Sequence, residues 1–259
     1  MELRNKHALI IGGSSGIGLA TVKKLASHGC NITIIHRDRR QGLADLESVI
    51  NELKSNHDIS ITNFNIDATN AEKIHECISD ISEGGIKKFD IVLHAVSRGN
   101  LKPFVSDGPK LNSQDLALTI DAMGTNLRVW VDELINRNLI GEGSRILTLT
   151  SEGNDKFWAG YGAVALAKST LETLSRYLAI ELAPKGMTVN IIQAGVTDTP
   201  SLRLIPGAEE LIEQSKKRNP YKKLTTPEDV ANTVYLLSQP EAKWINGALI
   251  HVDGGEHLI

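Results

Sequence analysis

Strand-length apolar runs alternate with longer segments of helical periodicity along the whole chain, and this alternation limits the possible folds more than any other feature. The apolar runs lie at residues 7–11, 31–36, 59–66, 89–95, 144–150, 187–192 and 248–252. The helical segments lie at residues 16–28, 40–55, 71–82, 114–136, 161–182 and 227–238. The apolar runs are continuous rather than alternating in polarity, which is typical of strands covered by helices on both faces. The pattern predicts a doubly wound α/β domain with a seven-stranded parallel sheet.

One long stretch, residues 197–224, has no clear strand and is rich in Pro, Lys and Glu. It follows the carboxyl end of a predicted strand, which is the edge of an open α/β sheet where ligands bind. We therefore expect this stretch to form a small substrate lid. No repeat or low-complexity linker interrupts the chain, so residues 1–259 are predicted to be a single domain.

The composition argues against several other classes of protein. The formal net charge is −3, whereas nucleic-acid-binding domains usually carry a clustered positive excess. The chain has neither a secretory leader pattern nor an apolar run of about 18 residues, so we expect a cytoplasmic protein that does not enter a membrane. Cys30 and Cys77 show no spacing typical of a metal site or a disulfide framework. We expect both to be ordinary thiols, and no metal.

A glycine-rich segment, IGGSSGIGLA, follows the first predicted strand directly and opens the first predicted helix. In a dinucleotide-binding turn, Gly12 would permit the tight turn, Gly16 the approach to a pyrophosphate and Gly18 close packing of helix on strand. Ser14, Ser15 and Ile17 lie in the same turn, where the two hydroxyls can donate to phosphate. A glycine trio is often only a turn, but its place between strand and helix predicts a Rossmann-type cofactor site.

The residues after the second and third predicted strands bear on the choice of cofactor. His36 ends the second strand and Arg37 follows, where an NAD enzyme usually carries a carboxylate and where Arg suits the 2′-phosphate of NADP. This predicts NADP(H), although Asp38 is adjacent and a solvated basic turn is the alternative. Asp67 and Ala68 follow the third strand and are expected at the adenine, unless Asp67 is a simple turn residue.

Several motifs in order resemble the short-chain dehydrogenase/reductase family over essentially the whole chain. They are GGSSGIG, the Asp of NIDATN, LHAVS, LTLTSEG, the helix with Tyr161 and Lys168, VNIIQAG and the C-terminal HVDGG. Most members space Tyr and Lys four apart, but here the separation is seven. Seven residues turn a helix by about 700°, so both side chains still project from one face. This spacing, with HAVS and AG in place of the usual Asn-Asn-Ala-Gly and Pro-Gly, is most similar to the NADPH-dependent enoyl-acyl-carrier-protein reductase (type III) branch.

The resemblance implies roles for the residues at the carboxyl edge of the sheet. Tyr161 would donate to the thioester oxygen as charge develops there, and Lys168 would bind the nicotinamide ribose and lower the Tyr pKa. Thr150 falls on the family's catalytic Ser, with Ser151 beside it, and the family's helix Asn falls loosely on Asp121. The remaining residues expected at the cofactor are His94, Ala95, Ala194, Gly195, Val196 and Thr199.

The function predicted in this way is the reduction of trans-2-enoyl thioesters with NADPH in fatty-acid or related synthesis, with the substrate on acyl carrier protein or coenzyme A. A ketoreductase or alcohol dehydrogenase whose Tyr has shifted along the helix is the alternative within the family. A non-catalytic NADP(H) sensor is the alternative outside it, but the retention of Tyr161 and Lys168 argues against a sensor. The resemblance also implies a homo-oligomer, commonly a tetramer.

Overall fold

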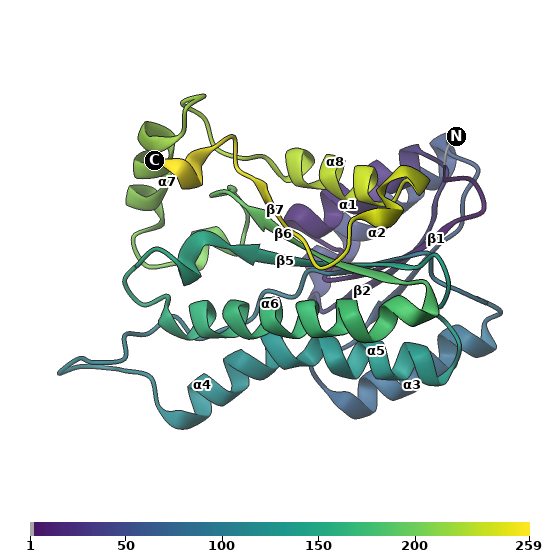
Figure 1. Ribbon diagram of the computed structural model, residues 1–259, viewed down its shortest axis with the longest axis horizontal. Helices are drawn as coiled ribbons and strands as arrows, with labels where there is room; N and C mark the ends of the chain where they lie inside the picture. Colours follow the sequence, from purple (N-terminus) through teal and green to yellow (C-terminus); the bar gives the residue numbers. More distant parts are fainter. Residues whose placement is uncertain (1–2) are drawn as a thin grey trace.

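The predicted strands form one parallel sheet in the computed structural model, which describes residues 3–259 (Figure 1). The strands are β1 His7–Ile11, β2 Asn31–His36, β3 Ile61–Asn65, β4 Ile91–His94, β5 Arg145–Ser151, β6 Thr188–Ala194 and β7 Leu249–Val252. Their order is β3-β2-β1-β4-β5-β6-β7, and every neighbouring pair is parallel. Because the order reverses between β1 and β4, the carboxyl ends of these strands flank the crevice where such sheets bind ligands. The prediction of a doubly wound α/β fold with seven parallel strands is confirmed.

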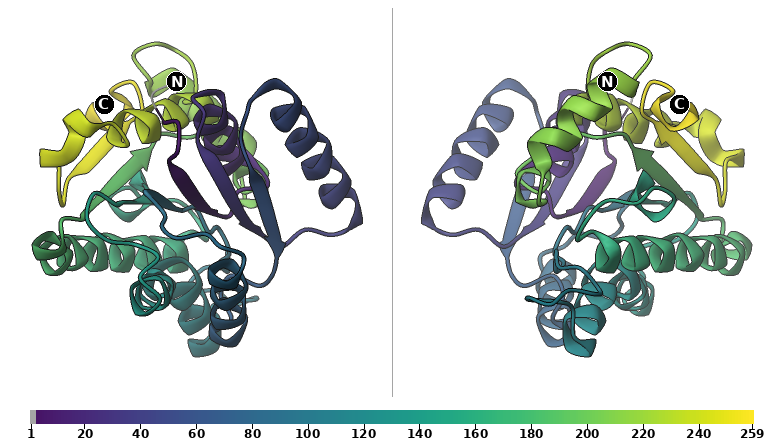
Figure 2. Two further views of the ribbon diagram at one scale, coloured as in Figure 1. Left: turned by 90° about the vertical axis from the view of Figure 1, so that its right-hand side faces the viewer. Right: turned by 90° about the vertical axis from the view of Figure 1, so that its left-hand side faces the viewer.

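Helices cover both faces of the sheet (Figures 1 and 2). On one face lie α1 Gly16–Ser27, α2 Arg40–Asn56 and α8 Pro227–Leu237, and on the other lie α3 Ala71–Glu83, α5 Asn126–Asn136 and α6 Gly162–Leu182. Successive strand residues supply the two cores alternately: Ile10 packs under the first layer, and Leu9 and Ile11 pack under the second. The sheet is therefore held from both sides, which fixes the positions of the strand ends.

The third strand departs from the prediction that all strands are covered on both faces. β3 is the edge of the sheet, and only Ile61 within it is fully buried. Thr62, Asn63 and Asn65 are exposed. An edge strand needs fewer apolar residues because no helix covers it completely, and the polar ITNFN run already carries this signal.

The predicted helix at residues 114–136 is interrupted. α4 Ser113–Ile120 leads into one π-helical turn, Asp121–Thr125, before α5 begins. The turn lies against α6 at Gly124, where an added Cβ would come within 2.9 Å of the Ala167 carbonyl oxygen. Apolar periodicity does not reveal a single wide turn, because the segment stays helical on both sides of it.

The expected lid contains regular structure of its own. Leu202–Leu204 is a short 3₁₀ turn and α7 Ala208–Arg218 is a helix, beside the carboxyl edge of the sheet in Figure 1. A parallel bridge between Thr197 and Thr225 closes the base of the segment. No helix within residues 3–259 is long and apolar enough to cross a membrane.

Candidate active site

A cavity of about 740 Å³ opens at the carboxyl edge of the sheet, between the glycine-rich turn, the start of α6 and the lid. It brings together nearly all the residues predicted for the site. These are Gly12, Ser14, Ser15, Gly16, Ile17, Gly18, His36, Arg37, Asp67, Ala68, Ala95, Thr150, Ser151, Tyr161, Lys168, Ala194, Gly195, Val196 and Thr199. They come from segments far apart in the sequence, and the sheet topology makes them neighbours.

The glycine-rich turn has no room for a Cβ at Gly12 or Gly18. Gly12 has a φ of +93°, and a Cβ there would lie 2.7 Å from the Ala95 carbonyl oxygen. A Cβ on Gly18 would overlap the Gly12 carbonyl oxygen. Ser15 precedes α1 without a side-chain hydrogen bond to the helix, so the first N–H groups of α1 stay available at the cavity. A helix N-terminus of this kind favours a phosphate, and the turn fits the pyrophosphate of a nicotinamide dinucleotide.

We predict that Gly18→Ala weakens binding of the nicotinamide dinucleotide by about tenfold or more, because the turn must open to accept the methyl group. Gly141→Ala is the matched control, since a Cβ at Gly141 meets nothing within 4 Å. Fluorescence titration of the reduced cofactor measures both variants. Equal affinities for the two would show that the turn does not hold the dinucleotide.

An ion-pair cluster lies in the wall of the cavity, at the residue Asp67 that was expected to meet the adenine. The Asp67 Oδ2 accepts hydrogen bonds from Arg37 Nη1 at 2.7 Å and from Arg98 Nη1 at 2.8 Å. Partial burial raises the pKa of Asp67, but hydrogen bonds from Thr69 and Arg98 outweigh it and hold the pKa well below its ordinary value. The carboxylate is therefore ionised and holds two guanidinium groups at the cavity. The sequence analysis missed Arg98, which is adjacent to the LHAVS motif.

Tyr161 and Lys168 both reach the cavity from the first turns of α6. The Tyr161 hydroxyl lies 3.1 Å from the Ser151 hydroxyl, and the Lys168 Nζ donates to the Leu149 carbonyl oxygen at 2.8 Å. Burial lowers the pKa of Lys168 to about 8, opposed by the nearby Glu172 carboxylate. Burial raises the pKa of Tyr161, and the Ser151 hydrogen bond only partly offsets this. The expected lowering of the Tyr161 pKa by Lys168 is thus not seen, and the phenol is protonated at neutral pH.

Ser151, rather than Thr150, contacts Tyr161. The Thr150 hydroxyl donates to the Glu172 carboxylate at 2.7 Å in the interior. Neighbouring residues of a strand point to opposite faces, and β5 extends through Ser151, so only one of the two hydroxyls can face Tyr161. The structure therefore corrects the assignment of the family's catalytic Ser to Thr150.

Two other expected residues lie away from the cavity. The His94 ring is fully buried and pairs with the Asn126 side chain, with 3.2 Å between Nε2 and Oδ1. Burial lowers the pKa of His94 to about 4, so the ring is neutral. It contacts α5 through Asn126 and does not line the cavity. Asp121 is exposed and accepts from the Thr125 hydroxyl, because it opens the π-helical turn. The assignment of the helix Asn to Asp121 is therefore wrong, and Asn126 is the buried amide of this helix.

The cavity wall also carries a set of apolar side chains. They come from the loop after β4, the π-helical turn, residues 157–164 and the lid, namely Leu101, Met123, Phe157, Trp158, Val164, Leu202, Leu204, Ile205 and Leu211. The Trp158 indole N–H donates to the Pro206 carbonyl oxygen at 3.0 Å and connects the cavity wall to the lid. One cavity thus joins the glycine-rich turn, Tyr161 and Lys168 to apolar side chains that could contact a hydrocarbon chain.

The chain is similar over nearly its whole length to known reductases. A family profile described as "Enoyl-(Acyl carrier protein) reductase" matches residues 12–257. The enoyl-(acyl-carrier-protein) reductase (NADH) FabI of Bacillus subtilis (strain 168) is 26% identical over 262 residues, covering 100% of this chain and 97% of that protein. The enoyl-(acyl-carrier-protein) reductase (NADPH) FabI of Staphylococcus aureus (strain MRSA252) is 24% identical over 261 residues, covering 100% and 99%. The crystal structure of the enoyl-(acyl-carrier-protein) reductase (NADH) from Aquifex aeolicus VF5 matches with a TM-score of 0.86 at 26% identity, covering 100% and 99%.

Proposed function

The chain belongs to the enoyl-(acyl carrier protein) reductase family of short-chain dehydrogenases/reductases, and from this premise we propose that it reduces the C=C bond of trans-2-enoyl thioesters with NADPH. One observation carries the proposal. Tyr161 and Lys168, seven residues apart, line a single cavity together with the glycine-rich turn and a set of apolar side chains. The thioester would lie beside Tyr161, with its acyl chain against the apolar side chains.

The side chains support a simple division of labour. Bound NADPH would supply the hydride, which adds to the β-carbon and shifts charge to the thioester oxygen; a proton from solvent at the α-carbon then completes the saturated thioester. The Tyr161 hydroxyl, protonated at neutral pH, donates to that oxygen as the charge develops. The Ser151 hydroxyl orients the phenol. The Lys168 ammonium would stabilise the negative charge of the enolate and donate a hydrogen bond to a ribose hydroxyl of the cofactor.

The choice of NADPH rests on the ion-pair cluster. Arg37 and Arg98 place two guanidinium groups beside the adenine end, each about half exposed, so both remain available to a 2′-phosphate. Asp67 would hold them in place. The similar reductases of Bacillus subtilis and Staphylococcus aureus use NADH and NADPH respectively, and the dissociation constants below distinguish the two cofactors.

We predict that Arg37→Gln lowers affinity for NADPH by about 10- to 100-fold while affinity for NADH changes little, because one charge-assisted hydrogen bond to the 2′-phosphate is lost. Arg128→Gln is the control, since Arg128 is exposed on α5 and pairs only locally with Asp132. Dissociation constants for both cofactors measure the effect. A parallel loss of NADH and NADPH would mean that Arg37 has no part in discrimination.

The activity itself is tested by mixing the purified protein with NADPH and a crotonyl or longer trans-2-enoyl thioester and following absorbance of the reduced nicotinamide. Thioesters of coenzyme A and of acyl carrier protein are run in parallel, so that the assay also identifies the carrier. A β-ketoacyl thioester and NADH complete the set. Turnover of the keto substrate alone would reassign the protein as a ketoreductase, which the Ser151–Tyr161 hydroxyl pair would also serve.

We also propose that the protein assembles as a homotetramer. Its α6 carries exposed apolar residues on the side away from the sheet, among them Leu166, Tyr177 and Ile180. A contiguous exposed apolar patch marks an interaction surface, and this helix face would supply one between copies of the chain. Size-exclusion chromatography with light scattering is expected to give four times the chain mass of 28.2 kDa, and a monomer would refute the assembly.

A further inference from the structure

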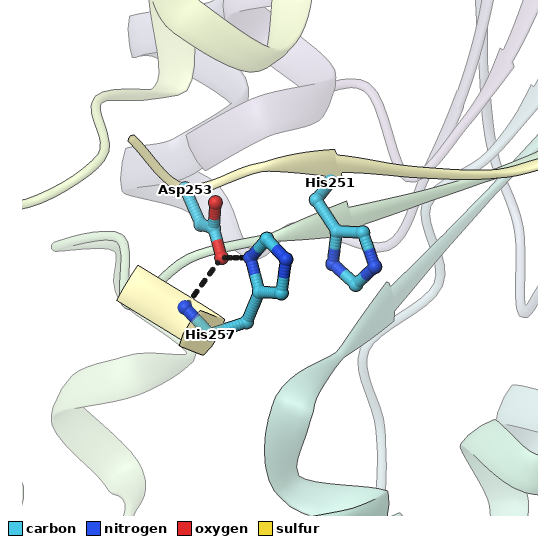
Figure 3. Close-up of side chains that lie close together, drawn as sticks. All are labelled: His251, Asp253 and His257. Atoms are coloured by element: carbon cyan, nitrogen blue, oxygen red, sulfur yellow. Dashed lines mark hydrogen bonds and ion pairs between the residues drawn. The ribbon is translucent and has the colours of Figure 1, made fainter. Parts of the chain in front are cut away.

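Two histidines and an aspartate lie close together near the C-terminal turn, outside the cavity of the candidate active site (Figure 3). His251 lies on β7, Asp253 follows that strand, and His257 lies in the C-terminal turn Glu256–Leu258. Each of the three offers a metal-ligand atom, and these atoms all lie within 4.8 Å of one another. The sequence analysis predicted no metal because it relied on cysteine spacing, and the tertiary structure assembles these residues from a strand and a turn.

Asp253 fixes the orientation of the His257 ring. Its Oδ2 accepts from the His257 backbone N–H at 2.9 Å and lies 2.6 Å from the His257 Nδ1, while its Oδ1 accepts from the Gly255 backbone N–H. A carboxylate oxygen this close to Nδ1 accepts the ring proton there, so the neutral ring presents its Nε2 lone pair. This is the carboxylate–histidine arrangement that orients metal ligands.

His251 supplies the second imidazole. Its ring stacks on that of His257, with 3.8 Å between the ring centres and 11° between the planes. Because an imidazole binds an ion in the plane of its ring, the His251 ring has to rotate out of this stack for both histidines to bind one ion. The His251 residue is exposed, so an ion could reach it from solvent. A cavity of about 540 Å³ adjoins the pair and leaves space for water ligands. Its lining includes the charged residues Asp229 and Lys223 besides Asp253, and Asp229 is engaged as the cap partner of Thr226.

We propose that His251 and His257 bind a divalent transition-metal ion, with Asp253 holding His257 in the ligating tautomer and water completing the coordination. Neutral imidazoles suit Zn²⁺, Ni²⁺ and Cu²⁺, whereas the hard ions Mg²⁺ and Ca²⁺ prefer sets of oxygen ligands that this cluster does not offer. Zn²⁺ is the probe of choice because it undergoes no redox chemistry. The proposal is independent of the proposed reductase activity.

The position of the cluster gives the ion a structural consequence. Glu256, next to His257, is fully buried and accepts from Arg218 at the end of α7, and Arg218 also pairs with Glu152 in the wall of the active-site cavity. The Lys156 Nζ donates to the carbonyl oxygen of the C-terminal Ile259 at 2.9 Å. An ion bound by both β7 and the C-terminal turn would therefore stabilise that turn, which contacts α7 of the lid through Glu256 and Arg218.

Isothermal titration of chelator-treated full-length protein with ZnCl₂ at pH 7.5 tests the site. We expect one ion per chain, and a melting temperature that rises with Zn²⁺ concentration because the ion binds the folded state. Asp253→Asn is expected to weaken binding by about 10- to 100-fold, as loss of an outer-shell carboxylate usually does. His251→Gln should weaken it at least as much, and because His251 is exposed this variant should fold normally.

His75→Gln is the matched control, since His75 is another exposed histidine beside a carboxylate, 3.1 Å from Glu133. Its Zn²⁺ affinity should equal that of the unaltered chain. Absence of binding at millimolar Zn²⁺, or equal affinity in His251→Gln and in the unaltered chain, would overturn the proposal. Circular dichroism of each variant without metal separates loss of ligands from loss of fold.

Discussion

Replacement of Tyr161 by phenylalanine is expected to lower kcat by about 10²- to 10³-fold, the usual cost of removing one donor to a developing oxyanion. The ring can stay in place because only the hydroxyl is lost, and that hydroxyl has one protein partner among the described residues, Ser151. Affinity for NADPH should hardly change, because Tyr161 acts on the acyl oxygen. Single-turnover and steady-state rates with an enoyl thioester, together with the NADPH dissociation constant, measure the effect.

Tyr177→Phe provides the matched control for this substitution. Tyr177 lies on α6 as well, but its side chain is exposed on the single chain and does not line the cavity. Its variant should turn over normally. Ser151→Ala should reduce kcat less than Tyr161→Phe, because Ser151 orients the donor. If Tyr161→Phe kept most of its turnover, another group would have to stabilise the enolate, and the proposed role of Tyr161 would fail.

The second large effect is expected at Lys168, where Lys168→Met should lower turnover by about 10²-fold or more and yet stabilise the fold at pH 7. Burial lowers the pKa of Lys168 from 10.5 to about 8, so carrying the charge at neutral pH opposes folding. At about 1.4 kcal/mol per unit this amounts to at most about 3 kcal/mol. Loss of the Nζ–Leu149 hydrogen bond subtracts about 1 kcal/mol, which leaves a net gain of about 1–2 kcal/mol.

The sign of the pH dependence follows from the same shift. The folded-state pKa of Lys168 lies below the unfolded value, so between about pH 8 and pH 10.5 the unfolded chain binds more protons at this group. This group therefore makes the free energy of unfolding rise with pH across that window, and its destabilising effect is fully present below pH 8. In Lys168→Met this contribution disappears. Binding of NADPH by the unaltered protein should weaken above about pH 8, as the ammonium loses its proton.

Urea denaturation at pH 7 and at pH 10 measures the stabilities, with Lys185→Met as control because Lys185 is exposed and far from the cavity. A less stable Lys168→Met at pH 7 would contradict the prediction and show that the Nζ–Leu149 bond contributes more than the charge costs. Unchanged turnover in this variant would remove Lys168 from the mechanism. The two readouts fail independently, so stability and catalysis are tested separately.

The pair Thr150 and Ser151 shows what a sequence leaves undecided at an active site. Both are hydroxyl residues at the end of a strand, and counting along the motif placed the family's serine on Thr150. Strand geometry requires that they face opposite ways, but it does not say which one faces Tyr161. The buried Glu172 on α6 decides this, because it accepts the Thr150 hydroxyl and leaves Ser151 beside Tyr161.

Features that depend on local geometry could be predicted from the sequence. The alternation of strands and helices, the glycine turn and the shared face of Tyr161 and Lys168 each involve residues within one strand, turn or helix, where fixed periodicities apply. The tertiary structure was needed to show the pairing of Arg98 with Asp67 across 31 positions, the hydrogen bond of Thr150 to Glu172, and the burial of His94. These contacts join segments that are distant in the chain, and their partners are selected by how the helices pack on the sheet, which no local pattern encodes.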